Sequence, residues 1–285
     1  MFRIFTFKQL SILTVIICFL LLSGAVVSTV SPIISASAKS GVPVPIIMYH
    51  QITEDKNILG DYAIPLSVLK EDFEYLKEND IVPISFKQLR DFTERGVPLP
   101  KKCVCITFDD GQKTFLTKVL PLLEEYNFPA NVNVVGALTV LYTENNDNDD
   151  RYAYLNKSDI KNLYNNPLVE IGCHTYNLHS LSNRRGAAKL QTETNSQYTS
   201  FINTDLEKFG ELYTELTGDV PTIFAYPYGI RNDLLAELIS EKGYKITLSC
   251  RESVNVLSVG SPLYELGRFN RPYKLSSQTF FSKMF

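Results

Sequence analysis

The segment "CVCITFDDG", residues 103–111, joins an apolar run to two adjacent carboxylates and a glycine. The run Cys103–Phe108 is typical of a buried strand, and the polar residues follow where such a strand ends. Two neighbouring carboxylates repel each other and shift each other's pKa unless a cation lies between them. The segment therefore predicts a buried strand followed either by a cation-binding loop or by an Asp-Gly turn that caps the next helix.

Similar apolar runs recur along the chain with helical patterns between them. They predict strands at 45–49, 81–84, 103–108, 131–135, 168–172, 222–226 and 245–248. Seven strands that alternate with helices indicate an α/β fold with a parallel sheet, either open or closed into a barrel. Helices are expected from Leu66 to Leu76 after Pro65, at 113–126, and at 188–217 with a stop at Gly218.

The first 38 residues are expected to serve export and not to belong to the fold. Arg3 and Lys8 precede an uncharged, largely apolar stretch that runs to about residue 34, and Ala36-Ser37-Ala38 has the form of a signal-peptidase site. The apolar stretch is also long enough to span a bilayer. Residues 1–38 are therefore predicted to be a signal peptide or an N-terminal membrane anchor, and residues 39–285 a single domain.

The charge of the remaining chain argues against nucleic acid as a partner. Without Arg3 and Lys8 it carries 26 basic and 31 acidic side chains, a net charge of −5. A polyanion held by bulk charge needs the opposite balance, so a neutral substrate is favoured. Contact with a membrane is expected only through the N-terminal segment, if that segment is not cleaved.

The cysteines and one acidic stretch carry weaker signals. Cys103 and Cys105 are two apart in a predicted strand, so they share a face and are poorly placed to form a disulfide with each other. A bridge between Cys173 and Cys250 stays open. The stretch "TENNDNDDRY", residues 143–152, is predicted to be a solvated insertion; the alternative is a cation site, although it lacks the spacing of a calcium loop.

The chain has only three histidines, and each follows a predicted strand. His174 and His179 are five residues apart, which on a helix places them roughly 140° apart, so a shared helix face does not explain the pair. They lie instead on the loop after the strand 168–172. An Asp and two His on loops from neighbouring strand ends form a three-ligand set with open positions, as in catalytic metal sites.

Three motifs in this order resemble those of the polysaccharide deacetylases of carbohydrate esterase family 4. They are "TFDDG" at 107–111, "HTYNLH" at 174–179 and "FAYPYG" at 224–229, and the resemblance covers nearly all of 42–285. It implies a distorted (β/α) barrel and the metal-dependent removal of N-acetyl groups from amino sugars of a glycan.

The resemblance also implies roles for individual residues. Asp109 matches the catalytic base, and Asp110, His174 and His179 match the ligands of one divalent metal ion. Zinc is the first choice for that ion, although two imidazoles and a carboxylate suit other first-row divalent metals too. The backbone N–H of Tyr228 matches the oxyanion donor.

The sequence departs from the usual family pattern in ways that point to one branch. Four residues separate the two histidines, a feature of the poly-β-1,6-N-acetylglucosamine deacetylases and their relatives. Ala225 stands where many members carry an Arg that tethers the base, and the late Asp-rich motif is missing around 248–252. The stretch "PVPIIMYHQI", residues 43–52, resembles the start of those enzymes, in which motif order is permuted, and His50 then fits the general acid.

Other interpretations remain open. Tyr226 and Tyr228 are expected either to stack on a sugar ring or to be buried structural residues. A metal-independent glycoside hydrolase on a similar barrel explains the aspartates but gives the histidine pair no task. A catalytically inactive glycan-binding relative is the third alternative. The substrate is expected to be an N-acetylated glycan, with poly-N-acetylglucosamine, peptidoglycan and chitin-like oligomers not distinguished.

Overall fold

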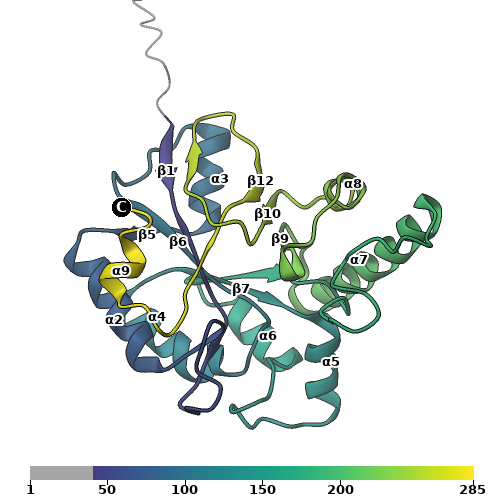
Figure 1. Ribbon diagram of the computed structural model, residues 1–285, viewed down its shortest axis with the longest axis horizontal. Helices are drawn as coiled ribbons and strands as arrows, with labels where there is room; N and C mark the ends of the chain where they lie inside the picture. Colours follow the sequence, from purple (N-terminus) through teal and green to yellow (C-terminus); the bar gives the residue numbers. More distant parts are fainter. Residues whose placement is uncertain (1–40) are drawn as a thin grey trace, which may run out of the picture. The chain divides into compact units, whose positions relative to one another are not determined.

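A curled parallel sheet forms the centre of the fold in a computed structural model that describes residues 41–285 (Figure 1). Its hydrogen-bonded order is β12-β10-β9-β8-β7-β6-β2-β13, with β5 also paired to β6, and every pairing is parallel. The strands are β2 (Ile46–Tyr49), β5 (Val82–Pro83), β6 (Cys103–Phe108), β7 (Ala130–Val134), β8 (Val169–Cys173), β9 (Ile223–Ala225), β10 (Ile246–Leu248), β12 (Leu263–Leu266) and β13 (Phe269–Asn270). All seven predicted strands are present, and the α/β prediction is confirmed.

The two edges of this sheet belong to one stretch of chain. Leu263 in β12 lies opposite Ile246, whereas Phe269 in β13 lies opposite Ile47 at the other edge. Only Gly267 and Arg268 separate the two strands. The chain thus bridges both edges of the curled sheet, which confirms the distorted (β/α) barrel and places Arg268 at the joint.

Side chains of β6 alternate between two apolar cores, as the pleat of a strand requires. Val104, Ile106 and Phe108 belong to the larger core cluster, and Cys103 and Cys105 belong to the smaller one. The prediction that the two cysteines share a face is confirmed. All four cysteines of the described chain are free thiols, so Cys173 and Cys250 do not form a bridge.

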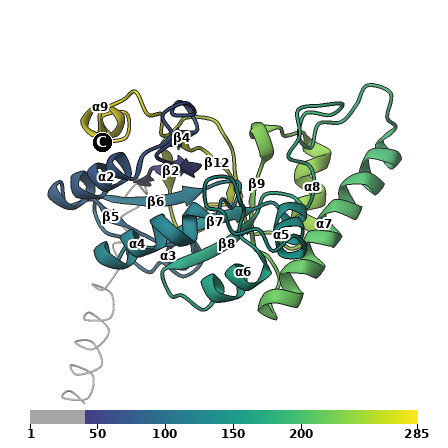
Figure 2. The same ribbon diagram turned by 90° about the horizontal axis from the view of Figure 1, so that it is seen from below.

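Helices follow most strands, as Figure 2 shows from a second direction. They are α2 (Leu66–Glu78), α3 (Phe86–Arg95), the π-helical turn η1 (Phe115–Val119), α4 (Leu120–Tyr126), α5 (Gly136–Glu144), α6 (Lys157–Tyr164), α7 (Asn195–Thr217), the 3-10 turn η2 (Pro227–Gly229), α8 (Asp233–Glu241) and α9 (Ser277–Phe281). The last helix packs on α2, where Tyr75 and Phe281 stack with ring centroids 4.8 Å apart. Pro65 directly precedes α2, as predicted.

The predicted helix 188–217 begins later than expected. The side chain of Thr194 accepts a hydrogen bond from the backbone N–H of Gln197, and this capping box starts α7 at Asn195. Its end is as predicted, because Gly218 adopts a left-handed conformation with φ 79°. Residues 188–194 are instead irregular, with a turn at 191–192.

Two small two-stranded sheets complete the described chain. In one, β1 (Val42–Val44) pairs antiparallel with β11 (Asn255–Leu257). In the other, β3 (Gln51–Ile52), which directly follows His50, pairs with β4 (Ala63–Ile64). The segment 1–38, predicted to be a signal peptide or anchor, lies outside the described residues. Within residues 41–285, no helix combines the length and the apolar character that crossing a membrane requires.

Candidate active site

The three predicted metal ligands meet at the carboxyl edge of the sheet. Asp110 follows β6, and His174 directly follows β8. Oδ1 of Asp110 lies 3.6 Å from Nε2 of His174 and 3.2 Å from Nε2 of His179. One ligand atom from each residue falls within 4.8 Å of the others. The two loops thus bring together the carboxylate and both imidazoles.

The backbone at these loops explains how the side chains are placed. Asp110 and Gly111 both adopt left-handed conformations, with φ 74° and 73°, so the chain turns sharply after β6. Aspartate tolerates this region better than most residues. A Cβ at Gly111 would lie 2.9 Å from Cγ1 of Val134, so the turn also requires the absence of a side chain there.

The orientation of the histidines fits metal binding. Nδ1 of His174 donates a hydrogen bond to the carbonyl oxygen of Ala225 at 2.8 Å, which leaves the lone pair on Nε2, facing Asp110. Burial lowers the pKa of both His174 and His179 and so favours their neutral, ligating form.

An unpaired oxygen supports the same conclusion. Oδ1 of Asp110 is buried and has no hydrogen-bond partner in the described part of the chain. An unpaired buried carboxylate oxygen beside two imidazole lone pairs is unfavourable unless a cation joins them. The donor set suits a first-row divalent ion.

Asp109 lies beside this cluster and is held by Arg268. Nη1 of Arg268 donates to Oδ1 at 2.8 Å, and Nη2 donates to Oδ2 at 2.7 Å. The two residues are 2% and 0% exposed. Burial alone would raise the pKa of Asp109, but the Arg268 guanidinium, with smaller contributions from His174 and His50, holds it well below its usual range. Asp109 is therefore an ionised, rigidly oriented carboxylate.

Sequence reasoning missed Arg268. Ala225 occupies the place of the expected tether, and the guanidinium comes instead from the joint between β12 and β13, where Nε of Arg268 also donates to the carbonyl oxygen of Ser249 at 2.9 Å. The available signal was a lone cation within the otherwise mostly apolar segment 263–270, which indicates a buried charge that needs a partner.

His50 lies at the same edge, immediately after β2. Its ring packs edge-on against Tyr62 with centroids 4.9 Å apart. Its Nδ1 atom is buried and has no partner among the described residues. A charge on His50 lowers the pKa of Asp109 and of His179, so the imidazole lies within electrostatic reach of both. The general-acid role of His50 stays a prediction.

The two tyrosines of "FAYPYG" have different environments. Tyr226 is 1% exposed and packs in the core against Phe224, with centroids 5.2 Å apart. This burial leaves no ring face for a sugar and corrects that expectation in favour of the structural alternative. Tyr228 is half-buried, and its ring stacks on His179 at 4.7 Å. Tyr228 thus covers one face of a predicted metal ligand.

The acidic stretch 143–152 is largely exposed, but the chain that follows it contacts the site. The backbone N–H of Lys113 donates to the carbonyl oxygen of Ala153, and that of Leu155 donates to Gly111, both at 2.8 Å. Burial raises the pKa of the Tyr154 phenol, and the nearby Asp110 carboxylate raises it further. The described chain contains no second cluster of three metal-ligating side chains, so the cation alternative for 143–152 gains no support.

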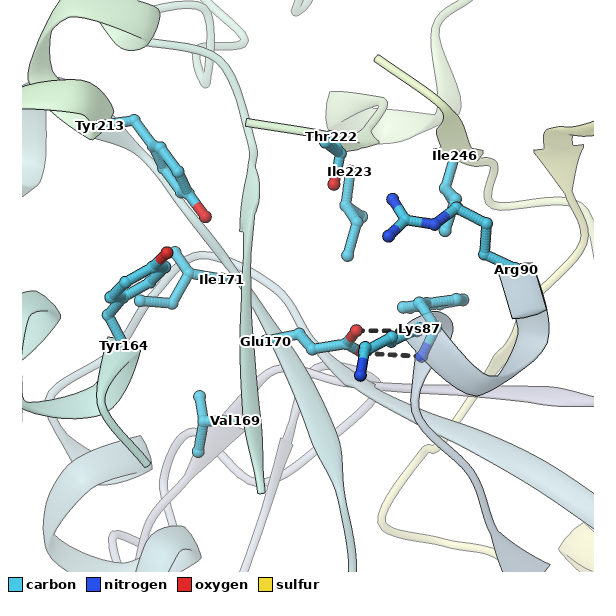
Figure 3. Close-up of a pocket in the computed structure, with 11 residues that line it drawn as sticks. Lys87, Arg90, Tyr164, Val169, Glu170, Ile171, Tyr213, Thr222, Ile223 and Ile246 are labelled. Carbon is cyan, nitrogen blue, oxygen red and sulfur yellow. Dashed lines mark hydrogen bonds between the residues drawn. The ribbon is translucent and has the colours of Figure 1, made fainter. Parts of the chain in front are cut away.

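A cavity of about 270 Å³ lies at the amino ends of the strands, opposite the metal cluster (Figure 3). Its walls include the first residues of β8, β9 and β10, whereas the predicted ligands follow strand ends. The Glu170 carboxylate accepts backbone hydrogen bonds there from Phe86 at 2.6 Å and Lys87 at 2.8 Å. This carboxylate satisfies the N-terminus of α3. None of the three predicted metal ligands lines the cavity, so it is separate from the metal cluster.

Comparison with known sequences places this geometry in context. The family model described as polysaccharide deacetylase matches residues 96–247. A poly-beta-1,6-N-acetyl-D-glucosamine N-deacetylase of Escherichia coli (strain K12) is 27% identical over 217 residues, which are 70% of this chain and 32% of that protein. A protein of the same name from Staphylococcus aureus (strain MSSA476) is 28% identical over 194 residues, 68% of this chain and 63% of that protein. This chain therefore spans less than two thirds of the length of either relative.

Solved structures share the fold. A de-N-acetylase from Aggregatibacter actinomycetemcomitans has a TM-score of 0.69 at 23% identity, over 85% of this chain and 98% of that one. IcaB from Ammonifex degensii has a TM-score of 0.67 at 21% identity, over 80% of this chain and 91% of that one. At these identities the likeness concerns the fold.

Proposed function

Because this chain belongs to the polysaccharide deacetylase family, we propose that it hydrolyses the N-acetyl group of N-acetylglucosamine residues in a glycan and releases acetate. The observation that carries the proposal is the pairing of the Asp110, His174 and His179 cluster with an ionised Asp109 that Arg268 holds in place. A ligand set with open positions next to an oriented base is the arrangement that metal-assisted hydrolysis requires.

The roles of the residues follow from their positions. A divalent ion held by Asp110, His174 and His179 would supply Lewis-acid chemistry to the amide carbonyl. Asp109 accepts a proton from the attacking water, and Arg268 fixes the direction in which its carboxylate can do so. His50 donates a proton to the departing amine, and the backbone N–H of Tyr228 stabilises the developing oxyanion.

Poly-β-1,6-N-acetylglucosamine is the proposed substrate, supported by the names of the two bacterial relatives. The net charge of −5 without Arg3 and Lys8 is compatible with a neutral acetylated polymer. Residues 39–285 form the proposed catalytic domain. Residues 1–38 export it, so the enzyme acts outside the cell, either secreted or attached to the outer face of the membrane.

Parallel assays on different glycans test this proposal. Purified full-length protein is incubated with poly-β-1,6-N-acetylglucosamine, peptidoglycan and chitin oligomers, and both acetate and new reducing ends are measured. We expect acetate from the β-1,6 polymer without new reducing ends. New reducing ends without acetate would favour the glycoside hydrolase, and neither product from any glycan would favour an inactive glycan-binding relative.

A further inference from the structure

Asp109, Asn133 and Gly172 lie in one row across the neighbouring strands β6, β7 and β8, with Asp109 directly after the end of β6. Asn133 in β7 is in register with Gly172 in β8. Phe108 is in register with Val132, so Asp109, which follows β6, is level with Asn133. Because residues in register on adjacent strands point to the same face of a sheet, the side chain of Asn133 lies between Asp109 and the space above Gly172.

Asn133 gives the Asp109 carboxylate an additional donor. Its Nδ2 donates to Oδ1 of Asp109 at 2.7 Å, and Asn133 is fully buried. Oδ1 also accepts from Nη1 of Arg268, while Oδ2 accepts only from Nη2 among the described residues. Each carboxylate oxygen has two lone pairs, so the free accepting capacity remains on Oδ2.

Gly172 provides the space for this contact. A Cβ at position 172 would lie 2.1 Å from Oδ1 of Asn133 and 3.2 Å from its Cγ. Oδ1 of Asn133 is buried and has no hydrogen-bond partner within the described chain. An unpaired buried carbonyl oxygen is unfavourable in a folded protein, so we expect another part of the Asn133 amide to make a favourable interaction. The bond from Nδ2 to Asp109 is that use.

We propose that Asn133 is a positioning residue for proton transfer by Asp109, and that Gly172 is required because it leaves room for the Asn133 amide. Asn133 occupies Oδ1 and thereby makes Oδ2 the oxygen that accepts the proton. The effect on turnover rests on the proposed deacetylase function, whereas the contact between Asn133 and Gly172 does not.

The first experiment compares Asn133→Ala with Asn131→Ala. Asn131 lies on the same face of β7, is 1% exposed, and donates to the carbonyl oxygen of Glu170 at 3.1 Å. Among the described residues it makes no hydrogen bond to Asp109. Loss of a hydrogen bond to a charged group predicts a kcat lower by roughly ten- to a hundredfold in Asn133→Ala, with KM and metal content unchanged. We expect Asn131→Ala to keep its kcat. An equal fall of kcat in both variants would overturn the positioning role.

The second experiment is a double-mutant cycle in urea unfolding, which needs no substrate. Gly172→Ala is expected to destabilise the protein, because the new methyl group displaces the Asn133 amide. In the Asn133→Ala background the same substitution should cost far less, since the 2.1 Å contact with Oδ1 of Asn133 is gone and the nearest remaining neighbour is Nδ2 of Asn131 at 3.1 Å. Additive losses would overturn the role of Gly172.

The two experiments also separate the two hypotheses. If the wild-type protein releases no acetate from any N-acetylated glycan, the proposed function fails and the turnover role of Asn133 fails with it. The unfolding cycle would still show whether Gly172 makes room for Asn133.

Discussion

Removal of Arg268 should destabilise the fold more than a typical substitution. The Asp109 carboxylate, 2% exposed in the wild type, loses both guanidinium bonds in Arg268→Ala, which leaves Asn133 as its side-chain donor. Breaking a buried ion pair by removing one partner costs about 3–5 kcal/mol, because the remaining charge is uncompensated. For a domain of this size, each kcal/mol lowers Tm by about 2–4 °C. The expected decrease is therefore roughly 6–20 °C.

The assay is thermal and urea unfolding followed by circular dichroism. Arg151→Ala is the matched control, because Arg151 is 79% exposed in its pair with Asp149 and its loss should leave the stability close to that of wild type. The double variant Asp109→Asn with Arg268→Ala should be more stable than Arg268→Ala alone, since no buried charge remains. A stability of Arg268→Ala within about 1 kcal/mol of wild type, or a double variant no better than the single one, would refute this reasoning.

Three further predictions concern metal binding, proton donation and pH. Replacing any one of the three proposed ligands, Asp110, His174 or His179, by alanine should abolish metal retention. Elemental analysis of the purified variants measures this. Asp109→Asn should retain the metal and lose turnover, and equal metal loss would contradict the division of roles. His50→Ala should lower kcat by roughly a hundredfold or more with metal intact, whereas near-normal turnover would assign the proton to another donor. Burial raises the pKa of Asp205 to about 6, above its unfolded value, so the folded state loses stability as pH rises from about 4 to 6. The variant Asp205→Asn should lack this loss, so its stability relative to wild type should rise by roughly 2–3 kcal/mol between pH 4 and pH 6. A stability difference between the two proteins that does not change with pH would contradict this prediction.

Local patterns account for the parts of the structure that the sequence predicts well. Each of the seven predicted strands is a short, mostly apolar run, and Asp110, His174 and His179 follow two of them. The carboxyl ends of parallel strands lie at the same side of the sheet, so the topology brings these three side chains close together. The start of α7 was predicted wrongly, although Thr194 and Gln197 have the spacing of a capping box.

The features that the sequence did not predict depend on contacts between residues far apart in the chain. Arg268 and Asp109 are 159 positions apart, and no local pattern joins them. The strands on either side of Arg268 have four and two residues, too short for a periodic signal. Tyr226 lies at a strand end where an aromatic side chain suits a binding surface or the core, and only the packing against Phe224 decides between them.

Metal dependence of acetate release tests the central claim most directly. The full-length protein is treated thoroughly with a chelator, assayed on poly-β-1,6-N-acetylglucosamine, and assayed again after zinc and other first-row divalent ions are added singly. We predict that chelation abolishes acetate release and that at least one of these ions restores it, with Asp109→Asn inactive throughout. Acetate release that survives complete removal of the metal would contradict the account.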